Sequence, residues 1–313
     1  MDAEAARWIS GFLAAAAAER DAARNTQLGY GRDLADFADW LARQGGDFAT
    51  ASRATVEAYL VFCGAQGLAA ATRARRLSSI RQLYRFAVEE GWRADNPALR
   101  LKGPAQAQHL PQVLSLAEVE RLLQAARDKG RTGAEQARNA ALLELLYATG
   151  MRVSELVGLP VAAVRGDPRM ILVRGKGGKE RMVPLSPPAR AALADWLAQR
   201  DTAEAVAVKA GKPASKHLFP NRSAAGHLGR EVFYALIKDI AVRAGVDPSK
   251  VTPHTLRHAF ATHLLAGGAD LRVIQTLLGH ADIATTEIYT HVLDEHLKDL
   301  VLTHHPLAKP RNA

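Results

Sequence analysis

The stretch Thr252-Pro253-His254-Thr255-Leu256-Arg257 is the most informative part of this sequence of 313 residues. Threonine followed by proline is typical of a helix start, with the threonine as cap and the proline in the first turn. His254 then lies in the first turn, where free backbone N–H groups and the helix dipole favour an anion. Arg257 shares that face. We therefore expect a helix that presents a histidine and an arginine to an anionic ligand.

Two more functional side chains are expected downstream of this helix. Asp270 can cap a helix over residues 271–278 that ends at a glycine, so His280 projects from a helix C-terminus. Asp282 can cap a last short helix that presents Tyr289. A tyrosine near fixed cations suits attack on a phosphodiester, although any single tyrosine is more often a packing residue.

Upstream, the sequence predicts a strongly apolar helix over about 139–148 that stops at Gly150, with Arg152 at the opening of the next short helix. The clearest β pattern follows, with a strand over 170–173, a glycine turn over 175–178 and a returning strand over 179–185. Lys176 is therefore expected at a hairpin tip, between glycines that let the backbone approach a ligand. Taken alone, a solvated turn lysine explains it better.

The combination of these residue types indicates chemistry on a phosphate ester. Two arginines can neutralise both non-bridging oxygens of a phosphodiester without a metal. A phenol with a pKa near ~10 needs a proton acceptor or local cations, and a lysine can protonate the leaving oxygen. His254 and His258 are four residues apart, but no glutamate lies between them and Arg257 would repel a metal ion. We therefore expect no metal and no cofactor. The sequence also contains no P-loop motif, so it gives no indication that the protein uses a nucleoside triphosphate.

Composition is typical of a soluble globular protein with a polyanionic partner, and the single cysteine fits the cytoplasm best. Hydrophobic content of 48% and charged content of 23% are ordinary for a soluble globular chain, and no apolar run suggests a membrane helix. The net charge of +9 favours a polyanionic partner. Cys63 is the only cysteine, which excludes an internal disulfide, and its apolar surroundings predict a buried small hydrophobe.

A linker over about 103–112 predicts two domains, over residues 1–107 and 113–313. The first domain is expected to be helical, with Asn25 or Thr26 capping an early helix, a helix over 54–65 and a basic helix from about residue 70. The second is expected to open on a capping box of Ser115 and Glu118. A basic helix of this kind suits the DNA major groove, and an ordinary surface helix fits the pattern equally well. The candidate DNA-binding residues on it are Arg73, Arg76 and Arg81.

Together these motifs resemble the tyrosine recombinases of the phage integrase family. The similar segments are Ala148–Leu156, Gly175–Arg181, Pro253–His258, Leu277–His280 and Ile288–His291. Within the family, the segments Leu142–Gly150 and His258–Leu265 are most similar to the bacterial Xer recombinases. The resemblance implies a mainly α fold of two domains: an N-terminal helical SAM-like core-binding domain, and a mixed catalytic domain with a small β-hairpin.

The resemblance also implies a role for each motif residue. Tyr289 would be the nucleophile that forms a 3′-phosphotyrosine, with Arg152 and Arg257 holding the phosphate. Lys176 would be the general acid and His254 would assist proton transfer. His280 would donate a hydrogen bond to the phosphate, and Glu155 would orient the segment that carries Arg152.

The family further implies a partnered assembly on double-stranded DNA. Xer proteins pair with a XerC-like paralogue in a heterotetramer on a dif-like site, resolve chromosome dimers and respond to an FtsK-type translocase. A C-terminal helix over about 294–302 would dock on a neighbouring protomer. Three alternatives remain at this point: an integrase of a phage or mobile element, a type IB topoisomerase, and a DNA-binding protein with an inactive recombinase fold.

Overall fold

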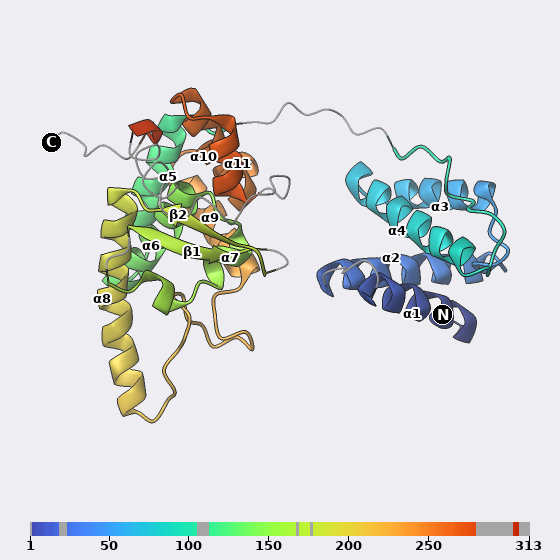
Figure 1. The fold of residues 1–313 in the computed structure, drawn as a ribbon, viewed down its shortest axis with the longest axis horizontal. Helices are drawn as coiled ribbons and strands as arrows, with labels where there is room; N and C mark the ends of the chain where they lie inside the picture. The colour runs from blue at the N-terminus through green and yellow to red at the C-terminus, as the bar shows by residue number, and fades with distance from the viewer. Residues whose placement is uncertain are drawn as a thin grey trace, which may run out of the picture. The chain divides into compact units, whose positions relative to one another are not determined.

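The computed structural model describes residues 2–18, 24–104, 113–166, 169–175, 178–279 and 303–306. The chain divides into two compact units, Met1–His109 and Leu110–Ala313. Helices dominate the described parts of both units, together with one two-stranded sheet (Figure 1). The expected mainly α fold is therefore confirmed. Within the described ranges, no helix combines the length and the apolar character that a bilayer span requires.

The described residues of the first unit form four helices around an aromatic core: α1 (Ala3–Ala18), α2 (Arg24–Arg43), α3 (Arg53–Ala65) and α4 (Ala70–Glu89). Phe37 and Tyr59 are fully buried, with ring centroids 4.7 Å apart. Cys63 is buried among these apolar side chains, as predicted. The expectation that Asn25 or Thr26 caps α2 is wrong, because the helix already begins at Arg24.

The described part of the second unit surrounds one buried helix. The elements in chain order are α5 (Leu116–Asp128), α6 (Gly133–Thr149), α7 (Val153–Val157), η1 (Val161–Val164), β1 (Met170–Arg174), β2 (Glu180–Pro184), α8 (Pro187–Lys209), α9 (Arg230–Arg243), η3 (Pro248–Lys250), α10 (Pro253–Ala266) and α11 (Leu271–Leu278). Residues 139–149 of α6 are buried on every side. A helix that is apolar all round belongs in the middle of a core.

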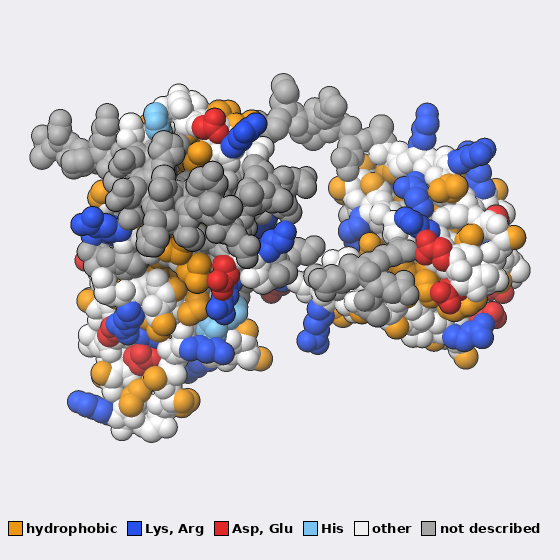
Figure 2. Space-filling model, in the orientation of Figure 1, with side chains coloured by type: hydrophobic (Ala, Val, Ile, Leu, Met, Phe, Trp, Pro, Cys, Tyr) orange, Lys and Arg blue, Asp and Glu red, His pale blue; other side chains and the backbone are white. Residues whose placement is uncertain are grey.

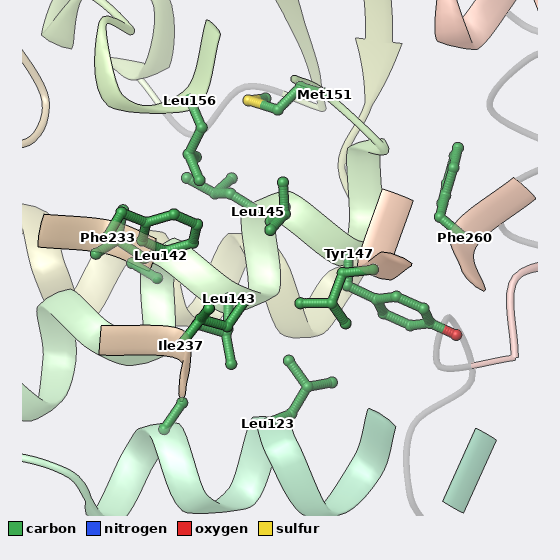
Figure 3. Close-up of a cluster of buried hydrophobic side chains, with 14 of the residues drawn as sticks. Leu123, Leu142, Leu143, Leu145, Tyr147, Met151, Leu156, Phe233, Ile237 and Phe260 are labelled. Atoms are coloured by element: carbon green, nitrogen blue, oxygen red, sulfur yellow. The ribbon is translucent and has the colours of Figure 1, made fainter. Parts of the chain in front are cut away.

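Figure 3 shows how α6 is covered. Leu142 and Leu143 of α6 face Phe233 and Ile237 of α9, and Leu123 of α5 packs from another side. The long helix α8 packs along α6 as well. This packing holds the C-terminal end of α6 in place, and the chain leaves that end through Gly150 to reach Arg152.

Side-chain caps set several helix starts of the second unit. The Oγ atom of Ser115 accepts a hydrogen bond from the Glu118 amide at 3.2 Å, and the Glu118 carboxylate accepts one from the Ser115 amide at 2.7 Å. Thr252 accepts from the Thr255 amide at 3.0 Å at the start of α10. Both caps were predicted. The start of α6 is earlier than expected, at Gly133, because Thr132 caps the helix there.

The hairpin pairs β1 and β2 in antiparallel register, with Val173 opposite Arg181. Ile171 and Val173 are fully buried, whereas Leu172 between them is exposed. Directly opposite residues of an antiparallel pair lie on the same face of the sheet. Arg181 therefore projects from the inner face of the hairpin, beside the buried side chain of Val173.

Candidate active site

Arg152 lies at the junction between α6 and α7. Gly150 ends α6 in the left-handed conformation with φ of 57°, and Arg152 is the N-cap residue of α7. The Arg152 amide donates to Oε2 of Glu155 at 2.7 Å, and its Nη1 donates to Oε1 of Glu155 at 3.0 Å. The Arg152 side chain keeps 40% of its surface exposed. Glu155 thus holds both ends of this arginine and leaves its outer side open to a ligand.

A second arginine, Arg181 of β2, binds the same carboxylate. Its Nη1 donates to Oε1 of Glu155 at 3.1 Å, and its Nη2 donates to Oε2 at 2.7 Å. Its Nε donates to the carbonyl oxygen of Leu277, in the last turn of α11, at 2.8 Å. The Arg181 side chain is only 9% exposed. Glu155 therefore accepts one bond from each arginine on each of its two oxygens.

Arg257 is the third guanidinium of the site and is buried. Its Nη1 donates to the carbonyl oxygen of Gly150 at 2.5 Å, and its Nη2 donates to that of Leu278 at 2.6 Å. Arg181 and Arg257 thus bind two successive carbonyl groups at the end of α11, where the helix dipole favours cations. Both arginines are oriented by backbone that the apolar core holds rigid.

The electrostatics of the site favour an anion. Burial alone would raise the pKa of Glu155, but hydrogen bonds from Arg181 and the Arg152 amide outweigh it and hold the pKa below its ordinary value. Burial, together with the charges of Arg152 and Arg181, lowers the pKa of Arg257 to about 10. Three cations thus surround one carboxylate, and an added phosphate would relieve the repulsion among them.

His254 lies exposed in the first turn of α10, three residues before Arg257, as the sequence predicts. Lys176, His280 and Tyr289 lie outside the residues that the structure describes. The described ranges contain no group of three His, Cys, Asp or Glu side chains arranged to hold a metal ion. Both oxygens of Glu155 are already occupied by arginine donors.

Arg181 is the member of this cluster to which the sequence gives no role. Its position in strand 180–184 offers one indication, because it stands opposite a buried valine where an apolar residue is the usual choice. A charged residue at such a position requires a buried partner. The partners of Arg181 are Glu155, 26 residues earlier, and Leu277, 96 residues later. The periodicity of a strand does not predict contacts over such separations.

The arginines of α4 mostly bind residues of their own unit. Arg76 is 18% exposed, forms an ion pair with Asp36 and donates to the Tyr59 hydroxyl at 2.8 Å. Arg81 donates to the carbonyl oxygens of Ala98 at 3.2 Å and Leu101 at 2.8 Å. Arg73 is half-buried. Contact of Arg73, Arg76 or Arg81 with DNA stays a prediction. In the view of Figure 2, basic and acidic side chains are interspersed on both units.

Comparison with known proteins gives matches over nearly the whole chain. The chain is 51% identical over 304 residues to Tyrosine recombinase XerD of Caulobacter vibrioides, covering 97% of this chain and 98% of that protein. It is 50% identical over 307 residues to Tyrosine recombinase XerD of Bradyrhizobium diazoefficiens, covering 95% and 96%. The expected resemblance to the Xer recombinases is confirmed, and both of these relatives are XerD proteins.

Solved structures match the fold as well. The XerH site-specific recombinase bound to palindromic difH substrate, a post-cleavage complex, has a TM-score of 0.67 at 25% identity over 90% of this chain and 81% of that one. The Tn1549 transposon integrase in complex with transposon right end DNA has a TM-score of 0.67 at 19% identity over 92% and 98%, which shows the fold alone.

Family assignment covers both units. Residues 9–91 match the Phage integrase N-terminal SAM-like domain, and residues 112–296 match the Phage integrase family. The second match includes Arg152, Glu155, Arg181 and Arg257, which are described residues of the site. The chain belongs to the phage integrase family, the tyrosine recombinases.

Proposed function

We propose that this chain is a site-specific tyrosine recombinase of the Xer type, which cuts and rejoins DNA through a 3′-phosphotyrosine and needs neither ATP nor a metal. The observation that carries this is the approach of Arg152, which Glu155 holds, and Arg257, which the ends of α6 and α11 hold. The two arginines come from segments more than 100 residues apart in sequence, and the charge of Arg152 contributes to the lowered pKa of Arg257. Such a group of preorganised cations stabilises the charge that a phosphodiester gains in its pentavalent transition state.

The proposed roles divide the reaction between charge stabilisation and proton transfer. Arg152 and Arg257 hold the non-bridging oxygens of the scissile phosphate, and Glu155 orients Arg152. Tyr289 attacks the phosphorus and displaces the 5′ oxygen, which Lys176 protonates. A 5′-hydroxyl from another strand then attacks the phosphotyrosine and joins the new partners.

The two histidines complete the proposed site. His254, in the first turn of α10, assists transfer of the phenol proton, and His280 hydrogen-bonds the phosphate. The phosphotyrosine conserves the energy of the broken phosphodiester, so rejoining requires no nucleotide.

The proposed domains are a core-binding domain over residues 1–107 and a catalytic domain over 113–313, on either side of a linker at about 103–112. We propose that the substrate is double-stranded DNA with a dif-like site. A XerC-like paralogue would complete a heterotetramer, and an FtsK-type translocase would control it. The setting would be chromosome dimer resolution in the cytoplasm, which serves chromosome partition at cell division.

An integrase of a phage or mobile element would use the same chemistry. It is not favoured, because about half of all residues are identical to XerD proteins over nearly the full length of both chains. The complete set of motif residues (Arg152, Lys176, His254, Arg257, His280 and Tyr289) argues against an inactive recombinase fold. A type IB topoisomerase would reseal the strand that it cut, whereas strand exchange joins different strands.

A nicked duplex that carries a dif-like site tests the proposal, because cleavage traps the covalent adduct. The wild-type chain should form the adduct, and Tyr289→Phe should bind the duplex but form none. An adduct with Tyr289→Phe would refute the nucleophile. Lys176→Ala should slow cleavage, and a 5′-bridging sulfur, a better leaving group, should restore the rate. If sulfur gives no rescue, Lys176 is not the acid.

A further inference from the structure

We propose that Arg181 is a positioning residue for strand cleavage, which balances the charge of Glu155 so that Arg152 keeps its positive charge for the scissile phosphate. This inference rests on the proposed function. Its basis is the shared carboxylate, on which each oxygen accepts one bond from Arg152 and one from Arg181.

Charge balance explains why the second arginine is needed. A buried carboxylate that met Arg152 alone would form a closed ion pair with no net charge to offer a phosphate. With Arg181 added, two guanidiniums share one carboxylate, and these three side chains keep one net positive charge in addition to that of Arg257. Arg181 is the inner member at 9% exposure, and Arg152 is the outer member at 40%. The surplus charge is therefore accessible at Arg152.

Arg181 also joins the site to the end of α11. Its two terminal nitrogens bind Glu155, and its Nε binds the carbonyl oxygen of Leu277. A single side chain thereby sets β2, the start of α7 and the last turn of α11 relative to one another. A lysine has no planar fork and cannot make these three bonds in fixed directions.

Two glycines show how closely the chain packs around this group. A Cβ atom at Gly175 would lie 3.3 Å from Oε1 of Glu155, and one at Gly279 would lie 3.2 Å from the Cδ atom of Arg181. Gly175 directly precedes Lys176 in the sequence, and Gly279 directly precedes His280. The Glu155–Arg181 pair therefore lies against the backbone at the start of two segments that carry predicted site residues.

The test compares Arg181→Gln with Arg174→Gln on a nicked dif-like duplex at saturating protein. Arg174 belongs to the same hairpin, but its side chain is 77% exposed and pairs with Glu180 instead of Glu155. We expect Arg181→Gln to slow adduct formation by about 100-fold, the effect of a misplaced reacting group, and Arg174→Gln to stay within about twofold of wild type. A rate for Arg181→Gln within about threefold of wild type would overturn the inference.

A methylphosphonate at the scissile position separates positioning from general damage to the fold. This uncharged group needs less cationic stabilisation, so the loss caused by Arg181→Gln should shrink to about tenfold or less. The double variant Glu155→Gln/Arg181→Gln removes the unbalanced carboxylate and should cleave the phosphodiester about tenfold faster than Arg181→Gln. An equal loss on both substrates, or no recovery in the double variant, would overturn the inference.

The same series separates this inference from the proposed function. If neither wild type nor Arg174→Gln forms an adduct, the proposed function fails and the inference fails with it. If both form adducts that Tyr289→Phe abolishes, and Arg181→Gln cleaves at the wild-type rate, the function stands and the inference alone fails.

Discussion

Arg257 donates to the carbonyl oxygen of Gly150 at 2.5 Å across 107 residues of sequence. The same guanidinium binds Leu278, so it joins the end of α6 to the end of α11. Gly150 can accept this bond because its left-handed backbone turns the chain at the end of α6. Arg257, which is proposed to bind phosphate, therefore also connects the two helix ends that hold its own side chain in place.

Arg257→Lys should destabilise the second unit, because one ammonium group cannot reach both carbonyl oxygens in the geometry of a fork. We expect the free energy of unfolding to fall by about 2–3 kcal/mol. Urea unfolding measures this. The control is Arg243→Lys, at an exposed arginine 3.8 Å from Asp239, which should change stability by less than about 0.5 kcal/mol. Equal losses in both variants would contradict the bridging role of Arg257.

Gly150→Ala should destabilise by about 3 kcal/mol or more, because the new Cβ atom would lie 2.3 Å from Cδ1 of Phe260 and the backbone is left-handed with φ of 57°. Gly245→Ala is a matched control, with φ of 61° and open space around the added atom. It should lose only about 1 kcal/mol from backbone strain. Similar midpoints for the two variants in urea would show that Phe260 yields to the methyl group.

His305 predicts a dependence of stability on pH. Its ring is 2% exposed and lies 4.9 Å from the ring of Tyr147, and burial lowers its pKa to about 4 from 6.5. Between these values the unfolded chain binds the proton and the folded chain does not. Stability should therefore be complete above about pH 6.5 and fall as the pH drops toward 4.

His305→Phe keeps an aromatic ring at this position and removes its titration. The loss of unfolding free energy between pH 7 and pH 4.5 should become smaller by about 2 kcal/mol, measured by urea unfolding at each pH. Part of the dependence should remain, because burial also lowers the pKa of His263, which bonds Tyr147 at 2.9 Å. An unchanged pH dependence would mean that His305 is not held neutral in the core.

Arg76→Gln should weaken the first unit, because it leaves Asp36 and the buried Tyr59 hydroxyl without their cation. We expect a loss of about 2–3 kcal/mol, whereas Arg85→Gln, at an exposed arginine paired with Glu89 one turn away, should be nearly neutral. Tryptophan fluorescence follows the transition, since three of the four tryptophans lie in this unit. Unchanged stability with weaker DNA binding in Arg76→Gln would instead favour direct contact with DNA.

The local features of the fold follow from short-range chemistry, which explains why sequence patterns predict them. The caps at Ser115 and Thr252 and the glycine that ends α6 each depend on contacts within a few residues. The expected cap at Asn25 or Thr26 is wrong, because a polar residue can cap a helix or lie in its first turn, and the local pattern does not distinguish the two positions.

The long-range features of the site are harder to predict from sequence. The motif spacing identifies Arg152 and Arg257, and the structure places Arg152 on Glu155 and Arg257 at the junction of α6 and α11. It does not reveal that Arg181 shares Glu155, because that contact depends on how the hairpin packs against α7 and α11. Similarly, helical spacing marks Arg76 as basic but gives no sign of its ion pair with Asp36, 40 residues earlier.

The burial of Cys63 makes the chain a convenient host for thiol labelling. This single sulfur is 1% exposed, so maleimide dyes should react with it only when the first unit opens. A cysteine introduced at an exposed position, such as Lys212 beyond α8, would then carry essentially all of the label. In the wild-type chain, the rate at which a maleimide modifies Cys63 would measure how often the N-terminal helices open spontaneously.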